Sequence, residues 1–167
     1  MPDDEREKLV RRHFRAFGRS ILERGILWWS RPERIKRLMH TEGWENLAPH
    51  LGKPLILMVP HFVGLDTGWT RLTLERQMAS IYSKQKNPVF NQTLLRGRLR
   101  FNLPRLLSRQ EGIRPIVKAV RDGLPLYYLP DMDYGPRDAL FVPFFGVTAA
   151  TITGLTRLAS MTDARVV

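Results

Sequence analysis

A histidine and an aspartate lie five positions apart, directly after the most apolar stretch of the chain. His61 and Asp66 follow the segment PLILMVP, residues 54–60, and Gly64 lies between them. An ideal helix would separate the two side chains by about 140°, and a strand would send them to opposite faces. They can meet only if the chain turns at Gly64, a conformation that glycine permits.

If the two side chains meet, the pair predicts proton-transfer chemistry. An imidazole titrates near neutral pH and can act as a general base. A carboxylate on its other ring nitrogen would fix the tautomer. No serine or cysteine nucleophile stands beside His61, so the base would activate a hydroxyl of the substrate itself. The alternative is structural, with Asp66 near the start of a helix and His61 hydrogen-bonded in the core.

Three arginines at alternate positions form the second candidate group. Arg96, Arg98 and Arg100 fall in a segment with helical character. A spacing of two residues spreads them around a helix, so some must face solvent. One of them directed toward the crevice beside His61 would bind a phosphate or a developing oxyanion.

A third group follows another apolar run, PLYYLP at residues 125–130. Asp131 and Asp133 come next, and Gly135 with Pro136 favours a turn. The D-M-D spacing is similar to the DxD that holds a metal–nucleotide pair in glycosyltransferases, and carboxylates suit Mg²⁺ or Mn²⁺. Turn formation by the two aspartates is the alternative.

Alternating strands and helices would position these residues. The patterns predict strands over residues 54–60, 78–84, 106–108, 125–130 and 164–167, and helices over residues 4–29, 33–39, 66–75, 88–101, 113–121 and 149–161. This order predicts an α/β domain with a mixed, largely parallel sheet flanked by helices. Ligands bind such sheets at the carboxyl ends of the strands, where His61 is expected. The last strand is expected beside the first or fourth, and because the chain stops inside it, we expect a piece of a longer protein.

Composition limits the possible partners. The 167 residues suffice for one domain, and 43% of them are hydrophobic. The absence of cysteine excludes disulfides and thiolate metal sites. A net charge of +11 favours anionic partners such as acidic lipids, phosphorylated substrates, an acidic carrier protein or nucleic acid. Trp28 and Trp29 beside Arg31 and Arg34 fit either a membrane interface or a packed aromatic corner.

Taken in order, four segments resemble the lipid A biosynthesis acyltransferases, relatives of the glycerolipid acyltransferases. They are HFVGLD, KQKNPVFNQTLLRGRLRFN, EGIRPIVKAVRDG and LPDMDYGPRDALFVPFFGVTAATITGLTRLASMTDARVV. The resemblance runs from about Arg11 to Val167. It implies one acyltransferase domain over residues 1–167, with an N-terminal helical segment at 1–50 and a glycerolipid-acyltransferase-like α/β catalytic core at 51–167 that lacks its C-terminal part.

The resemblance also implies an activity and a set of site residues. The family moves a fatty acyl chain, here lauroyl or myristoyl, from acyl carrier protein to a hydroxyl of a Kdo-bearing lipid A precursor. His61 and Asp66 match its catalytic pair, and Arg98, with Arg96 next, matches its substrate-side arginine. The residues that match the headgroup or acyl site are Asp131, Asp133, Tyr134 and Gly135.

The implied partners are acyl carrier protein, an anionic lipid A precursor and the inner-membrane surface, without nucleic acid. The implied location is the cytoplasmic face of the bacterial inner membrane. No metal and no cofactor are implied, the acyl carrier thioester being the donor substrate.

Two alternatives remain open. A glycerolipid acyltransferase would carry a sequence closer to Phe-Pro-Glu-Gly-Thr in the third block, which this chain lacks. A non-catalytic basic module that binds a membrane surface or nucleic acid would gather its cations on one face, whereas here they are spread over most segments.

Overall fold

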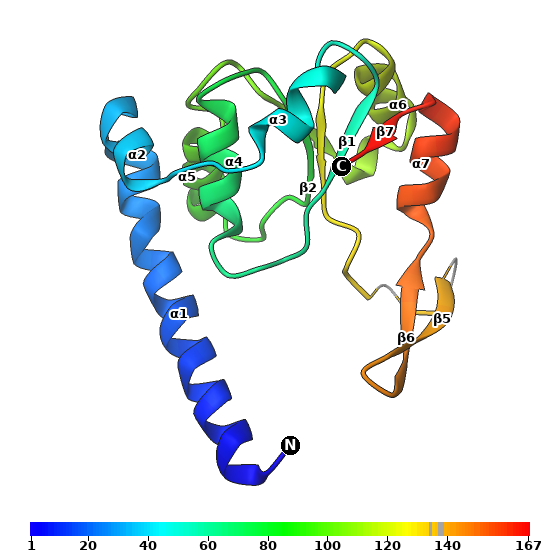
Figure 1. Cartoon of the computed structure of the whole chain (residues 1–167). Helices are drawn as coiled ribbons and strands as arrows, with labels where there is room; N and C mark the ends of the chain where they lie inside the picture. The colour runs from blue at the N-terminus through cyan, green and yellow to red at the C-terminus, as the bar shows by residue number, and fades with distance from the viewer. Residues whose placement is uncertain (134, 137–138) are drawn as a thin grey trace.

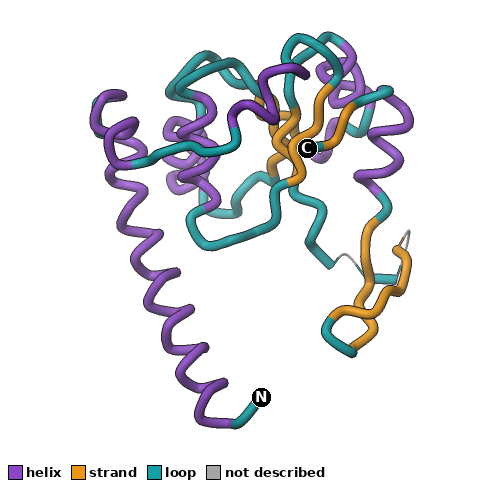
Figure 2. The backbone as a smooth tube through the Cα atoms, viewed as in Figure 1, coloured by secondary structure: helices purple, strands orange, loops and turns teal. Residues whose placement is uncertain are grey.

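The computed structural model describes residues 1–133, 135–136 and 139–167. Its centre is a five-stranded parallel sheet with the order β3-β2-β4-β1-β7 (Figure 2). The strands are β1 (Leu55–Met58), β2 (Ala79–Tyr82), β3 (Arg105–Ser108), β4 (Leu126–Tyr128) and β7 (Arg165–Val166). The predicted α/β class is confirmed, and the strand begun at Ala164 pairs with β1 as expected.

Helices cover both faces of this sheet. They are α1 (Asp3–Trp29), α2 (Pro32–Leu38), α3 (Trp44–Leu47), α4 (Leu65–Thr73), α5 (Pro88–Arg98), α6 (Arg114–Arg121) and α7 (Gly154–Thr162), with 3₁₀ turns η1 (Ala48–His50) and η2 (Arg109–Glu111). On one face Leu126 and Tyr128 of β4 pack with α6 and α7. On the other face Tyr127 packs with Trp69 of α4. Successive residues of a strand point to opposite faces of the sheet. A strand that is buried on both faces therefore has a continuous apolar sequence.

Among the described residues, the contacts of the long helix α1 with the domain come from its last turns. Trp28 packs over Gly97 of α5, where an added Cβ would overlap the indole ring. Arg100 donates hydrogen bonds to the backbone oxygens of Leu27 and Ser30. The two tryptophans therefore differ, because Trp28 is half-buried in a packed corner while Trp29 is 70% exposed.

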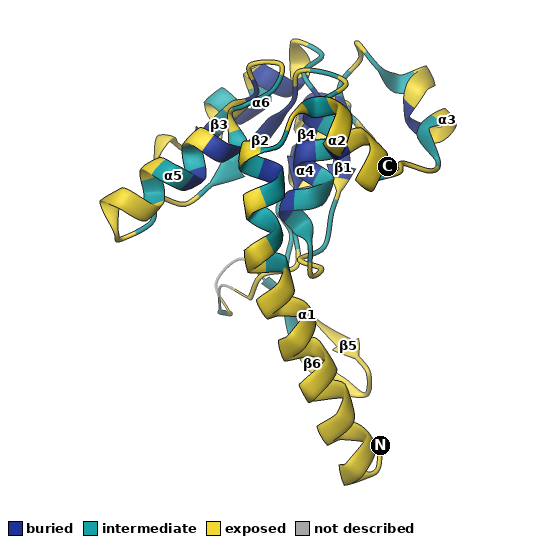
Figure 3. Cartoon of the chain, turned by 90° about the vertical axis from the view of Figure 1, so that its left-hand side faces the viewer, coloured by how far each residue is buried: buried dark blue, intermediate teal, exposed yellow. Residues whose placement is uncertain are grey.

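The N-terminal half of α1 extends away from the domain and is exposed throughout (Figures 1 and 3). The exposed apolar residues along the whole of α1 include Leu9, Val10, Phe14, Phe17, Ile21 and Leu22. None of the helices in the described residues combines the length and apolar character needed to cross a membrane.

A separate antiparallel hairpin follows the central sheet. It consists of β5 (Ala139–Phe144) and β6 (Val147–Ile152). The prediction of a helix over 149–161 is wrong for its first residues, since β6 runs to Ile152 and α7 begins at Gly154. β-branched residues at 147, 148, 151 and 152 fit a strand better than a helix.

Candidate active site

Parallel pairing of β1 and β4 brings two polar residues to the same edge of the sheet. Met58 is the register partner of Tyr128, and the Val59 N–H donates to the Tyr128 oxygen at 2.8 Å. His61 comes three residues after Met58, and Asp131 comes three residues after Tyr128. The two side chains therefore meet where the two strands end, at the edge where α/β sheets bind ligands.

Asp131 holds His61 through both of its carboxylate oxygens. Oδ1 lies 2.6 Å from the ring nitrogen Nδ1, and Oδ2 accepts the backbone N–H of His61 at 2.6 Å. Burial alone would raise the pKa of Asp131, but the hydrogen bonds from His61 outweigh it and hold that pKa below its usual value.

The charge on Asp131 decides the role of each imidazole nitrogen. An ionised carboxylate can only accept a hydrogen bond, so Nδ1 of a neutral His61 must carry the ring proton. The other nitrogen, Nε2, then has a free lone pair that can take a proton from a substrate. The imidazole is 41% exposed and accessible to a substrate.

Asp66 is placed elsewhere. Gly64 makes the expected turn at φ +89°, and α4 begins at the next residue. The first turn of α4 directs Asp66 toward two arginines, with Arg98 Nη2 at 2.7 Å and Arg24 Nε at 3.1 Å. In the described part of the chain no hydrogen bond or ion pair joins Asp66 to His61, and the carboxylate that contacts His61 is that of Asp131.

The three arginines have different surroundings. Arg98 binds Asp66 by two nitrogens, and its backbone oxygen accepts the indole N–H of Trp69. Arg100 binds the end of α1, and burial lowers its pKa. Arg96 is exposed. Since the group of Arg24, Asp66 and Arg98 has two cations and one anion, it retains a positive charge beside the loop that carries His61.

The residues after Asp131 form a turn. Asp133 Oδ1 accepts the backbone N–H of Gly135 at 2.7 Å, and Gly135 has φ +83°. This geometry supports the turn interpretation of Asp133. Tyr134 lies outside the described residues. Within the residues that are described, no three His, Cys, Asp or Glu side chains gather in a way that could hold a metal ion.

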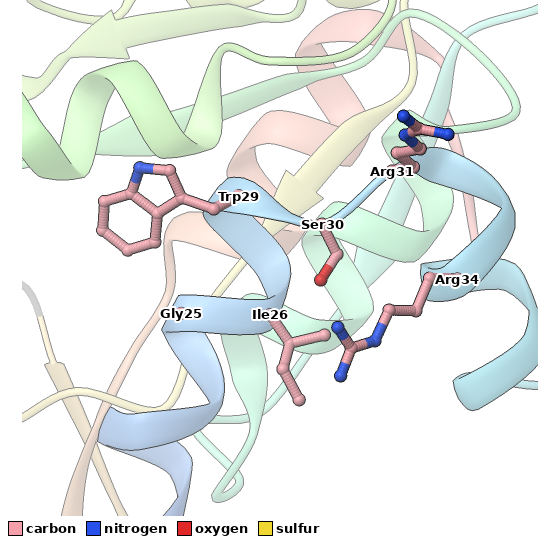
Figure 4. Close-up of a pocket in the computed structure, with 6 residues that line it drawn as sticks. All are labelled: Gly25, Ile26, Trp29, Ser30, Arg31 and Arg34. Carbon is pink, nitrogen blue, oxygen red and sulfur yellow. The ribbon is translucent and has the colours of Figure 1, made fainter.

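A pocket of about 570 Å³ lies at the junction of α1 and α2 (Figure 4). Its lining residues are Gly25, Ile26, Trp29, Ser30, Arg31 and Arg34. The guanidinium of Arg34 points toward Ile26 and the Ser30 hydroxyl, whereas the Trp29 ring points away from them. Neither His61 nor Asp131 lines this pocket, so the candidate site is defined by the contacts at the sheet edge.

Comparison with known proteins extends over the whole chain. Residues 1–167 match the family model described as bacterial lipid A biosynthesis acyltransferase. A lipid A biosynthesis acyltransferase of Haemophilus influenzae is 34% identical over 92% of this chain and 49% of its own length. The lipid A biosynthesis lauroyltransferase of Escherichia coli K12 is 33% identical, with 98% of this chain and 54% of that protein covered.

A third relative is the lipid A biosynthesis myristoyltransferase of Escherichia coli K12. It is 34% identical, with 98% of this chain and 51% of that protein covered. The chain thus spans about half the length of the relatives it matches.

Proposed function

Because the chain belongs to the bacterial lipid A biosynthesis acyltransferase family, we propose that it carries the site that moves a fatty acyl chain from acyl carrier protein to a hydroxyl of a lipid A precursor. The observation that carries this proposal is the pairing of His61 with the ionised Asp131 at the carboxyl edge of the sheet. The names of two relatives make lauroyl and myristoyl the first acyl groups to test.

The proposed chemistry needs one base and no enzyme nucleophile. His61 Nε2 takes the proton of the acceptor hydroxyl while its oxygen attacks the thioester carbonyl carbon. Asp131 stabilises the imidazolium that forms. When the tetrahedral intermediate collapses, the C–S bond breaks and the imidazolium returns its proton to the leaving thiolate. The products are an ester and a free carrier thiol.

The surroundings of His61 suit an amphipathic anionic acceptor. Phe62, at 74% exposure, and Val63, at 41%, offer apolar surface directly after the base. The positive charge retained by Arg24, Asp66 and Arg98 favours a phosphate group nearby. In this proposal the exposed Arg96 and the turn of Asp133 and Gly135 contact the acceptor. In this proposal the reaction takes place at the cytoplasmic face of the bacterial inner membrane.

Acyl transfer from labelled lauroyl and myristoyl carrier protein to a Kdo-lipid A precursor tests the proposal, and a new ester on the acceptor is expected. Lysophospholipid serves as the competing acceptor and acyl-coenzyme A as the competing donor. Transfer to lysophospholipid alone would establish the glycerolipid alternative. Binding of the lipid without any transfer would establish the non-catalytic one.

We expect acyl transfer to continue at an unchanged rate in excess EDTA. Both carboxylate oxygens of Asp131 are engaged by His61, and Asp133 Oδ1 accepts a hydrogen bond from Gly135. The same assay, run before and after chelation, measures this. Loss of activity that Mg²⁺ or Mn²⁺ restores would instead make the two aspartates metal ligands.

A further inference from the structure

The hairpin β5–β6 has an unusual surface for a soluble element. No charged residue occurs in residues 139–152. Its two strands pair only with each other within the described chain, and an isolated two-stranded hairpin is marginally stable in water. Most of its large apolar side chains are exposed, namely Leu140 at 61%, Phe141 at 60%, Phe144 at 63%, Phe145 at 93% and Val147 at 70%. Such a surface requires a covering partner.

The tip of the hairpin is not explained by folding. Phe144 pairs with Val147, so Phe145 and Gly146 form a two-residue turn with φ +48° and +79°. Turns with positive φ at both positions favour Asn, Asp or Gly at the first. A phenylalanine there is strained, and its ring contacts the ring of its neighbour Phe144 at 4.7 Å between centroids while remaining almost wholly exposed. A residue that is unfavourable for the turn and exposed in water points to a role outside the fold.

The position of the hairpin indicates the chemistry of its partner. The hairpin and the N-terminal half of α1 leave the domain on the same side, toward which β1 and β4 direct their carboxyl ends (Figures 1 and 3). This half of α1 exposes apolar side chains such as Val10 and Phe14. Over residues 3–24, α1 carries seven Lys or Arg and five Asp or Glu, and Lys8, Arg11 and Arg19 are each paired with an acidic residue of the same helix. Apolar side chains on two projecting elements, in a chain with a net charge of +11, are complementary to an anionic lipid surface.

We propose that the tip of the β5–β6 hairpin, Phe144 and Phe145, inserts into an anionic lipid surface and holds the His61–Asp131 pair beside it. Asp131 lies eight residues before Ala139, the first residue of β5, so insertion of the hairpin fixes the loop that carries Asp131 near the lipid. The inference deepens the membrane location proposed above. It does not depend on catalysis.

Flotation with vesicles of phosphatidylethanolamine and phosphatidylglycerol tests the proposal with the full-length protein and its Phe145→Asn variant. We expect the vesicle partition coefficient of the variant to fall about tenfold, the effect of withdrawing one phenylalanine side chain from an apolar phase. The melting temperature should stay the same or rise, because asparagine suits the turn better. The difference should persist at high salt, since it is apolar in origin.

Leu103→Asn is the matched control. Leu103 has φ +48° and is 81% exposed, close to the values of Phe145. It precedes β3 and therefore lies at the opposite edge of the parallel sheet. Its substitution should leave vesicle binding unchanged.

Three results would overturn the proposal. They are wild-type flotation of Phe145→Asn, an equal loss with Leu103→Asn, and a loss of self-association in sedimentation without any change in vesicle binding. The last result would identify a second copy of the chain as the covering partner. Because flotation uses no acyl donor, absence of acyl transfer leaves this proposal standing. If the protein does not float with vesicles, acyl transfer to a detergent-solubilised acceptor can still be measured, so the proposed activity is tested independently of membrane binding.

Discussion

Replacing His61 with alanine lowers kcat for acyl transfer by about 10²–10⁴, the usual contribution of a general base. The substitution removes the ring whose Nε2 takes the proton of the acceptor hydroxyl. It retains the backbone N–H that donates to Asp131 Oδ2 at 2.6 Å. Because the side chain is also partly exposed, we expect the melting temperature to stay near that of the wild type. Steady-state turnover and a thermal unfolding curve measure the two quantities.

His40→Ala is the control for loss of an exposed histidine at another place on the surface. It should leave both kcat and the melting temperature unchanged. Turnover of His61→Ala within a few-fold of the wild type, in a folded protein, would contradict the role of His61 as the base.

Sequence patterns predicted the elements of the site better than its contacts. Apolar runs identified β1 and β4, and the position of His61 after β1 was predicted correctly. The contact between His61 and Asp131 depends on which strands are neighbours and on their register. The contact between His61 and Asp131 spans 70 residues and has no local sequence pattern. His61 and Asp66, five residues apart, form a pattern that is easily recognised. The available signal was that His61 and Asp131 follow their respective apolar runs at the same distance.

The arginine segment shows a similar limit. Arg96 is exposed and Arg98 is paired with Asp66, as their spacing around a helix suggested, whereas Arg100 lies beyond the end of α5 and binds the end of α1. The partner of each one depends on the packing of α1 against α4 and α5, which bring Arg24 and Asp66 to Arg98. Tertiary packing of this kind cannot be obtained from a single periodic pattern.

The hairpin was missed for a third reason. Ala149 and Ala150 have high helix propensity and precede a true helix, so one helix was predicted over both. In the structure these residues pair with Val142 and Phe141 of β5. Pairing with a β-branched residue and an aromatic residue on the neighbouring strand overrides the weak local helix propensity of the two alanines. The β-branched residues around the two alanines and the glycine at 154 were the local indications of a boundary.

The roles of the two carboxylates can be separated by matched amide substitutions. Asp131→Asn keeps the shape of the side chain but removes the charge that fixes the His61 tautomer, so kcat should fall by about 10²–10⁴. The melting temperature should change little, because Asp131 is 37% exposed.

Asp66→Asn leaves Arg24 and Arg98 without their shared anion, and the free energy of unfolding should fall by about 1–3 kcal/mol. Denaturant unfolding and turnover are measured on both variants, with Asp163→Asn, at an exposed aspartate at the end of α7, as the control.

A double variant tests whether Asp131 acts through His61. If it does, His61→Ala combined with Asp131→Asn should be no slower than His61→Ala alone, because residues that act as one unit are not additive. If the loss of kcat in the double variant equals the product of the two single losses, Asp131 acts on the substrate independently of His61. If Asp66 rather than Asp131 orients His61, two results are expected. Asp66→Asn should lose most of its kcat at wild-type stability, and Asp131→Asn should keep near-normal turnover. Asp66 would then be the residue that orients His61 during the reaction, and α4 would have to rotate its first turn away from Arg98 to reach the imidazole.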